Sequence, residues 1–246
     1  MCTLSWVPLP GGYALAMNRD EQLTRSAGTP PALREVNRIP VICPTDAAAG
    51  GSWIAANALG HSLALLNRFE DTPHDPAGAF VSRGLLLLEL AGAPGPDSIG
   101  AALAGRALRP YRPFTLASLV PGSRPRLYEW SGQELTSSEV GEPGLLRASS
   151  GTAQAAAARE RAAVFAQAAA QHGGFTAELL GELHRSHLPV RGAVSICVHR
   201  DDAKTVSFSL ITVALDAVSF RQLEGSPCRS ERVSELCLPR YREPRG

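Results

Sequence analysis

MCTLSWVPLPGGYALAMNRDE, residues 1–21, contains two short stretches with the apolar-polar alternation of a β-strand, over 3–7 and 13–17. The intervening residues 8–12 are prolines, glycines and one leucine, which is typical of a turn. These features together predict a β-hairpin. If Val7 faces Tyr13, the numbers of paired residues sum to 20. In that register Cys2 lies opposite Asn18, and Arg19 stands one step beyond.

Cys2 is the candidate nucleophile. Removal of the initiator Met1 would give Cys2 a free α-amino group, with a reference pKa of about 7.7 to 8.0. Such an amine can take the thiol proton at neutral pH, so one residue supplies both nucleophile and base. Arg19 would favour the thiolate, and Asp20 or Asn18 would orient the amine. The alternative is that a cysteine stands at position 2 by accident.

A second hairpin is expected from residues 52–56 and 61–67, which are separated by a loop rich in turn-forming residues. Its register brings Asn67 beside Gly50 and Gly51, where a ligand can approach the backbone closely. The Asn67 amide could donate a hydrogen bond to an oxyanion, or it could simply begin the turn into Arg68. Trp53 could line the same pocket or belong to the core.

Composition and charge limit the possible functions. The 246 residues are 44% hydrophobic and carry a net charge of +1, so we expect a single domain over 1–246 with no general attraction for nucleic acid. Basic residues gather only near the end of the chain, at Arg240, Arg242 and Arg245. The sequence predicts neither a signal peptide nor a membrane span. We therefore expect a cytoplasmic protein with reduced thiols.

The cysteines and histidines do not follow a metal-binding pattern. The five cysteines are widely spaced without a CxxC motif, and the six histidines lack HxxxH or HxH spacing. His199 is the one histidine of interest, because with Arg200 it ends a strand-like stretch. The GxGxxG motif of nucleotide-binding folds is also absent. The sequence therefore predicts no metal site and no cofactor.

The remaining chain alternates between strand and helix patterns. Residues 22–38 are expected to form a loop and 40–44 an edge strand. Ser149 and Ser150 are expected to cap an alanine-rich helix whose solvated face carries Arg161. The alanine-rich helix is expected over 152–171, and other helices over 82–90, 96–108 and 175–185. Further strands are expected over 114–120, 126–130, 193–199, 204–213 and 217–220. This order favours an α+β protein with helices on the faces of antiparallel sheets.

Several motifs resemble those of the NRDE family, also called the Transport and Golgi Organisation 2 family. They are Met1-Cys2-Thr3, Asn18-Arg19-Asp20-Glu21, Gly50-Gly51-Ser52-Trp53-Ile54, Leu65-Leu66-Asn67 and Ser82-Arg83-Gly84-Leu85-Leu86. The family resembles a branch of the N-terminal nucleophile hydrolase superfamily. This resemblance implies the four-layer αββα sandwich of that superfamily, which agrees with the order of elements above.

The resemblance also implies roles for individual residues. In related branches an initial Met-Cys-Thr supplies the nucleophile, an arginine and an aspartate support it, and an asparagine after an apolar strand forms the oxyanion hole. The matching residues here are Cys2, Arg19, Asp20 and Asn67. Those branches carry a second asparagine where this chain offers only Ser149 and Ser150.

Two functions follow from the resemblance. The first is amide hydrolysis of a small-molecule substrate, with Asn18, Trp53 and Arg68 among the residues that contact it. The alternative is a non-catalytic protein that binds or transports haem or an acyl or lipid ligand in the same pocket. Composition does not separate the two.

Overall fold

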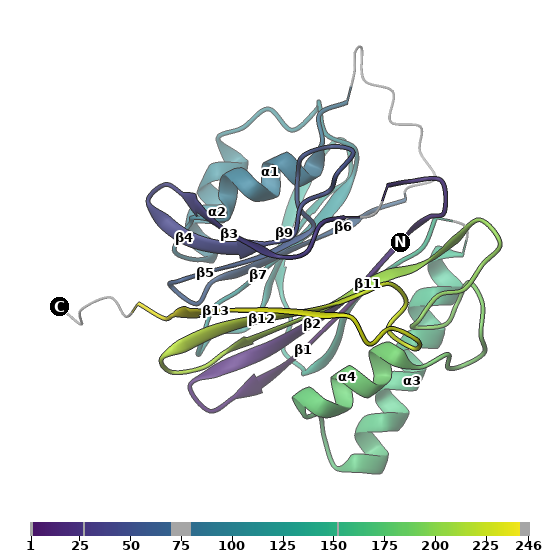
Figure 1. Cartoon of the computed structure of the whole chain (residues 1–246). Coiled ribbons are helices and arrows are strands. Elements are labelled where there is room, and N and C mark those ends of the chain that lie inside the picture. The colour runs from purple at the N-terminus through teal and green to yellow at the C-terminus, as the bar shows by residue number, and fades with distance from the viewer. Residues whose placement is uncertain (1, 27, 70–79, 152, 242–246) are drawn as a thin grey trace.

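The computed structural model describes residues 2–26, 28–69, 80–151 and 153–241 (Figure 1). The expectations that concern Met1, Thr152, Arg242 and Arg245 lie outside these ranges. In the described part of the chain, two antiparallel sheets and four helices form.

The first sheet joins strands from both ends of the chain. Its order is β10-β1-β2-β11-β12-β13. The bounds are β1 (Cys2–Leu9), β2 (Gly12–Gln22), β10 (Gly144–Ser149), β11 (Ala203–Val213), β12 (Ala217–Glu224) and β13 (Val233–Pro239). The N-terminal hairpin therefore occupies an interior position, with β10 on one side and β11 on the other.

The second sheet follows the order of the chain, from β3 to β9. Its strands are β3 (Ala32–Val36), β4 (Ile39–Cys43), β5 (Ile54–Asn57), β6 (Ser62–Asn67), β7 (Phe114–Leu119), β8 (Arg126–Trp130) and β9 (Leu135–Glu139). The helices are α1 (Arg83–Leu90), α2 (Pro96–Ala104), α3 (Gln154–His172) and α4 (Ala177–Arg185). Figure 1 shows α1 and α2 on one side of the paired sheets and α3 and α4 on the other.

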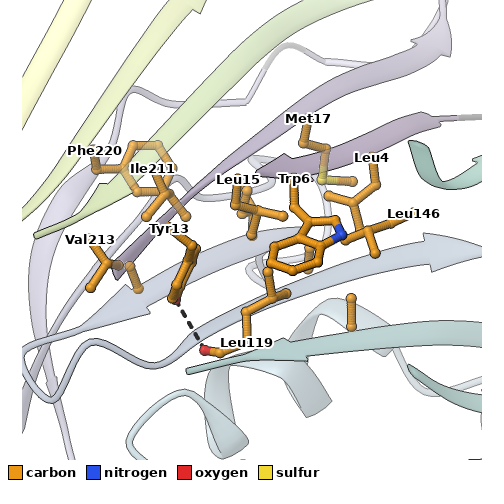
Figure 2. Packing of buried hydrophobic residues seen from close by; sticks show 14 of the residues in the cluster. Leu4, Trp6, Tyr13, Leu15, Met17, Leu119, Leu146, Ile211, Val213 and Phe220 are labelled. Carbon is orange, nitrogen blue, oxygen red and sulfur yellow. Dashed lines mark hydrogen bonds between the residues drawn. The ribbon is translucent and has the colours of Figure 1, made fainter. Parts of the chain in front are cut away.

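Three apolar clusters hold these layers together. The cluster between the sheets contains Leu4, Trp6 and Leu15 of the first sheet and Leu66 of the second (Figure 2). A second cluster packs α1 and α2 on the outer face of the second sheet, and a third packs α3 and α4 on the outer face of the first. The fold is therefore the expected four-layer αββα sandwich.

Tyr13 links the two sheets through its hydroxyl group. The hydroxyl oxygen lies 3.0 Å from the Leu119 carbonyl oxygen (Figure 2). It lies 2.7 Å from the Ser62 hydroxyl, and both partners belong to the second sheet. Burial raises the pKa of the Tyr13 phenol, so the group stays protonated and can donate. This contact fixes how the hairpin lies against the second sheet.

The predicted hairpin is confirmed, but its register is wrong by one residue. Leu9 pairs with Gly12, so the turn is the two residues between them rather than residues 8–12. Gly11 has φ +74°, which a glycine adopts readily in so tight a turn. Cys2 consequently pairs with Arg19 instead of Asn18. A shift of one residue exchanges the two faces of a strand.

The stretch 193–199 does not form the expected strand. It runs as a series of bends, with a single isolated bridge between His199 and Lys204. Its carbonyl groups accept hydrogen bonds from side chains instead: Val194 from Arg161 and Ile196 from Asn18. Buried apolar residues give the stretch a strand-like pattern, although only its end pairs with a strand, where the Thr205 N–H of β11 donates to the Val198 carbonyl.

Other differences concern strands that the sequence pattern does not predict. Strand β3 falls within the expected loop 22–38, and it makes β4 an interior strand rather than an edge. Strands β9, β10 and β13 are also absent from the expectation. Ser149 ends β10 instead of capping a helix, and α3 begins only at Gln154. In the described ranges, none of the helices combines the length and apolar character needed to cross a membrane.

Candidate active site

A cavity of about 290 Å³ opens between the ends of the two sheets. Cys2 and Arg19 line it from the first sheet, and Trp53 and Asn67 from the second. The start of α1 supplies Arg83. The cavity therefore brings together residues from widely separated parts of the chain.

Cys2 lies in a row of side chains that crosses four strands. The ladder pairs Cys2 with Ser149 of β10 on one side and with Arg19 of β2 on the other, and Arg19 pairs in turn with Ser207 of β11. Directly paired residues have Cβ atoms about 4.5 to 5.5 Å apart. The thiol is therefore flanked by a hydroxyl group and a guanidinium group.

The Cys2 thiol is almost completely buried, with 7% of the residue exposed. Burial raises the pKa of this thiol, and the nearby Asp20 carboxylate adds to the effect, whereas Arg19 acts to lower it. The Ser149 hydroxyl is also buried and has no hydrogen-bond partner among the described residues. Ser149 pairs with Cys2 in the ladder but does not itself line the cavity.

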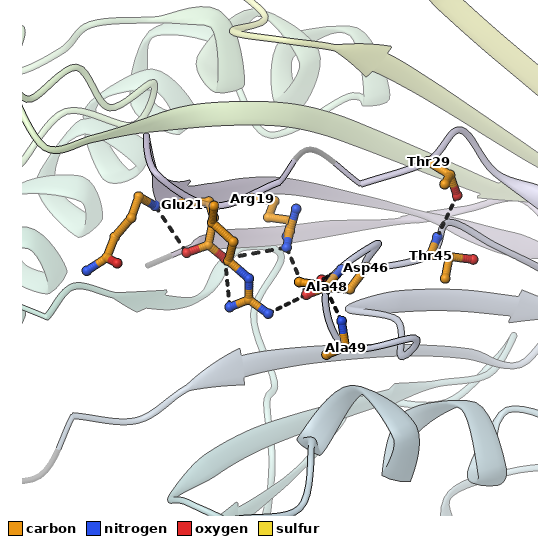
Figure 3. Close-up of polar contacts among 9 residues, drawn as sticks. Arg19, Glu21, Thr29, Thr45, Asp46, Ala48 and Ala49 are labelled. Atoms are coloured by element: carbon orange, nitrogen blue, oxygen red, sulfur yellow. Dashed lines mark hydrogen bonds and ion pairs between the residues drawn. The ribbon is translucent and has the colours of Figure 1, made fainter.

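Arg19 is held between an aromatic ring and two carboxylates. Its guanidinium carbon lies 4.2 Å from the centre of the Trp53 ring. One of its nitrogens lies 3.1 Å from a carboxylate oxygen of Asp46 and 3.4 Å from one of Glu21 (Figure 3). Asp46 also accepts a 2.6 Å contact from Arg25. Two carboxylates thus balance Arg19 and Arg25 on this wall of the cavity.

Asp20 lies beside a second buried cation, Arg161 of α3. The Asp20 carboxylate accepts a 2.6 Å hydrogen bond from the Thr205 hydroxyl. Burial raises the pKa of this carboxyl group, and the positive charge of Arg161 opposes the rise. Arg161 itself donates to Thr3 Oγ1 at 2.8 Å and to the Cys2 carbonyl oxygen at 3.3 Å. It therefore fixes the backbone of Cys2 and Thr3.

The Gly50-Gly51 turn has a different role from the one expected. A Cβ atom on Gly51 would lie 2.4 Å from the backbone of Gly84 at the start of α1. The Ser52 N–H also donates to the Gly84 carbonyl at 3.0 Å. It is thus the helix that approaches this glycine closely. The contact places Arg83 at the cavity.

Asn18 and Arg68 lie outside the cavity lining, in contrast to the expectation. The Asn18 side chain points to the opposite face of β2, where its amide nitrogen donates to the carbonyls of His184 and Ile196. This is the direct result of the register shift. Arg68 lies 3.7 Å from Glu129. Trp53 lines the cavity and also belongs to the core between the sheets.

Two arginines near the site were not recognised in the sequence. Arg161 was expected to be solvated, but it is fully buried. Its spacing gives a signal, since it falls on the same helix face as Ala157, Val164 and Ala168, all of which are buried. Arg83 follows the motif serine at the start of α1, where nothing in the spacing indicates that its side chain enters a cavity.

The fold is shared with several solved structures of low sequence identity. They include a variant of conjugated bile acid hydrolase from Clostridium perfringens, with TM-score 0.58 and 10% identity over 98% of this chain and 97% of that one. The N-acylethanolamine-hydrolyzing acid amidase orthologue of Caenorhabditis elegans gives 0.57 and 10% over 86% and 92%. Penicillin V acylase from Agrobacterium tumefaciens gives 0.53 and 10% over 89% and 82%.

These neighbours have the αββα sandwich of N-terminal nucleophile hydrolases, and the likeness extends to the fold alone. Comparison with curated proteins at the level of sequence gave no match. The family model of Transport and Golgi organisation 2 matches residues 1–187. Because this match spans more than half of the chain, the protein belongs to the Transport and Golgi organisation 2 family.

Proposed function

We propose that this protein is an amidohydrolase that uses Cys2 as an N-terminal nucleophile. The observation that carries the proposal is the cavity in which Cys2, Arg19 and Asn67 meet. The names of the structural neighbours support the reaction class, since they include an acylase and an acid amidase. The shared fold leaves the reaction of this chain to be tested.

The proposed reaction proceeds through a thioester. After removal of Met1, the α-amino group of Cys2 takes the thiol proton, and the thiolate sulfur forms a bond to the carbonyl carbon of the amide. The carbon–nitrogen bond then breaks, and the amine leaves with the proton returned by the α-amino group. Water attacks the thioester, releases the acid and restores the Cys2 thiol.

Groups around Cys2 suit these steps. Arg19 favours the thiolate against the effect of burial. Asp20 is proposed to orient the α-amino group, and Asn67 to donate to the oxyanion. Ser149 takes the place of a second amide donor, because its buried hydroxyl faces the Cys2 row and has no other partner in the described residues.

The charges of the cavity favour a substrate with an anionic group. Arg19 and Arg25 are balanced by Glu21 and Asp46. Arg83, by contrast, has no carboxylate partner among the described residues and donates only to the Pro113 carbonyl, at 2.7 Å. Burial, together with other arginines nearby, lowers the pKa of Arg83 to about 10. The Glu21 carboxylate acts on this guanidinium and opposes the fall in its pKa, and a carboxylate or phosphate bound there would pair with it directly.

One observation favours the alternative of a binding or transport protein. Burial raises the pKa of the Cys2 thiol. This favours the protonated thiol, which does not attack carbonyl groups. In that case the cavity would hold a haem, acyl or lipid ligand without cleaving it. All five cysteines are free, and for either function we propose a reducing compartment such as the cytoplasm.

Labelling of the cysteines separates the two functions. The Cys237→Ser variant, which lacks an exposed thiol, is treated with an acyl chloromethyl ketone that bears a carboxylate. The amidohydrolase proposal expects an adduct on Cys2, no adduct on buried Cys43, and complete loss of the Cys2 adduct in Cys2→Ala. A stoichiometric ligand that co-purifies while Cys2 stays unlabelled supports the carrier.

Two further measurements test the details. The intact mass of the purified protein must show loss of Met1, because an acylated or extended α-amino group cannot act as the base. A retained Met1 contradicts the proposal.

Arg83→Met should raise KM for an amide substrate that bears a carboxylate, and leave KM for its neutral isostere unchanged. An equal rise in KM for both substrates would contradict the proposed role of Arg83.

A further inference from the structure

A second cluster of reactive side chains lies outside the cavity, beyond α4. His187, Cys197, His199 and Cys228 each offer one ligand atom, and these atoms all lie within 4.8 Å of one another. They come from three places in the chain: the residues that follow α4, the bends that precede β11, and the loop between β12 and β13. Because the four residues come from three separate segments, the spacing of cysteines and histidines along the sequence does not reveal the cluster.

The distances within the cluster are close to those of a tetrahedral site. His199 Nε2 lies 3.6 Å from Cys197 Sγ and 3.3 Å from Cys228 Sγ. Zinc with Zn–S bonds of about 2.3 Å and Zn–N bonds of about 2.05 Å holds a sulfur and a nitrogen about 3.6 Å apart. One observed distance equals the expected value, and the other is about 0.3 Å shorter.

The fourth residue, His187, presents an unused ring nitrogen. Its Nε2 atom is buried and has no hydrogen-bond partner in the described ranges. The ring also packs edge-on against that of His199, with centroids 5.0 Å apart. A buried nitrogen without a partner beside two thiols and a second imidazole needs an explanation, and a metal ion supplies one.

We infer that His187, Cys197, His199 and Cys228 bind one zinc ion. Two cysteines and two histidines form a set typical of structural zinc, and four protein ligands leave no position for substrate. Zinc displaces the proton of each thiol, so the two thiolates neutralise the charge of the ion. This inference reverses the expectation drawn from sequence spacing, and it is independent of the proposed hydrolysis.

The position of the cluster suggests what the metal does. Residues 193–199 lack a strand ladder, yet this stretch supplies the carbonyl groups of Ala193 and Val194 to Arg161. Arg161 in turn holds the Cys2 carbonyl and Thr3. Zinc would fix the bends to the β12–β13 loop, and so hold the support of the nucleophile strand in place. The metal ion has a structural role, because it would connect residues 193–199 to the β12–β13 loop, and it does not take part in the proposed hydrolysis.

Metal analysis of the full chain tests the inference. The protein is produced with zinc in the medium, freed of any histidine tag, dialysed and analysed by mass spectrometry of the elements. We expect one zinc ion per chain in the parent and in Cys237→Ser, whose exposed thiol lies outside the cluster. Cys228→Ser should lose most of its zinc, because one thiolate ligand is missing.

A second measurement keeps the test valid if a variant folds poorly. Cobalt added to the zinc-free parent should give the visible absorption of tetrahedral thiolate ligation, and zinc should abolish it. Cys197→Ser, with the circular dichroism of the parent, should lose most of that absorption, because one of the two thiolate ligands is missing. A parent that takes up neither metal, or a Cys228→Ser variant that binds zinc as fully as the parent, would overturn the inference. A disulfide between Cys197 and Cys228 in protein purified under reducing conditions would overturn it as well.

Discussion

Replacing Arg161 with methionine removes the buried cation behind the start of β1 and leaves the apolar contacts of its stem almost unchanged. Arg161 is fully buried, and its guanidinium donates to Thr3 Oγ1, the shortest contact at 2.8 Å, and to the carbonyls of Cys2, Ala193 and Val194 at 3.3 to 3.5 Å. The Asp20 carboxylate would lose its neighbouring positive charge.

Removing one partner of a buried charged pair costs about 3–5 kcal/mol. We expect Arg161→Met to lower the free energy of unfolding by this amount, measured by urea denaturation. For a chain of this size, that corresponds to a fall in Tm of roughly 6–20 °C. Arg159→Met is the matched control, since Arg159 lies two residues earlier with 72% of its side chain exposed and should change stability by less than about 0.5 kcal/mol.

A double-mutant cycle with Asp20→Asn isolates the electrostatic part. If Arg161 and Asp20 stabilise each other, the double variant should be more stable than the sum of the single changes predicts, by about 1–3 kcal/mol. Additivity within about 0.5 kcal/mol would show that the two groups do not interact. It would thereby refute the view that Arg161 compensates the Asp20 charge.

Three further predictions concern the frame around the site. Burial lowers the pKa of His184 to about 3 and of His61 to about 4; the unfolded chain binds more protons below about pH 6.5, so stability should fall on acidification, by about 2 kcal/mol per histidine at pH 5. Urea denaturation at pH 7.5 and pH 5 measures this, and His184→Gln should show about half the dependence. Gly51→Ala should cost about 1–3 kcal/mol, because its Cβ would lie 2.4 Å from the backbone at the start of α1; thermal unfolding with an unchanged Tm would exclude that contact. Tyr13→Phe should lower the free energy of unfolding by about 1 kcal/mol, through loss of the hydroxyl contacts between the sheets, and no change in the urea midpoint would contradict it.

The sequence allowed the layers to be predicted because alternation and helical spacing report which face of an element is apolar. It did not fix register, which depended on whether the first turn contained two residues or five. That single uncertainty moved Asn18 from the cavity to the helix side and brought Arg19 opposite Cys2. Register follows from turn geometry and from the partner strands, which local pattern does not contain.

The prediction was weakest for groups that need distant partners. Strand β3 is mostly exposed along its whole length, so its residues lack the alternation of a half-buried strand. The bends at 193–199 are apolar enough for a strand, but their carbonyls bind side chains of Asn18 and Arg161. The position of the Arg83 guanidinium in the cavity likewise depends on contacts between α1 and the Gly50-Gly51 turn. Such features come from tertiary structure and leave no period in the sequence.

The interior position of the N-terminal hairpin sets the order in which the site can be assembled. Strand β2 pairs with β11, which begins about 180 residues later in the chain. At a synthesis rate of about 5–20 residues per second, the ribosome takes roughly 10–40 s to produce that partner. During this interval the first sheet cannot close around Cys2. The burial of Cys2 in the completed sheet therefore follows the synthesis of β11.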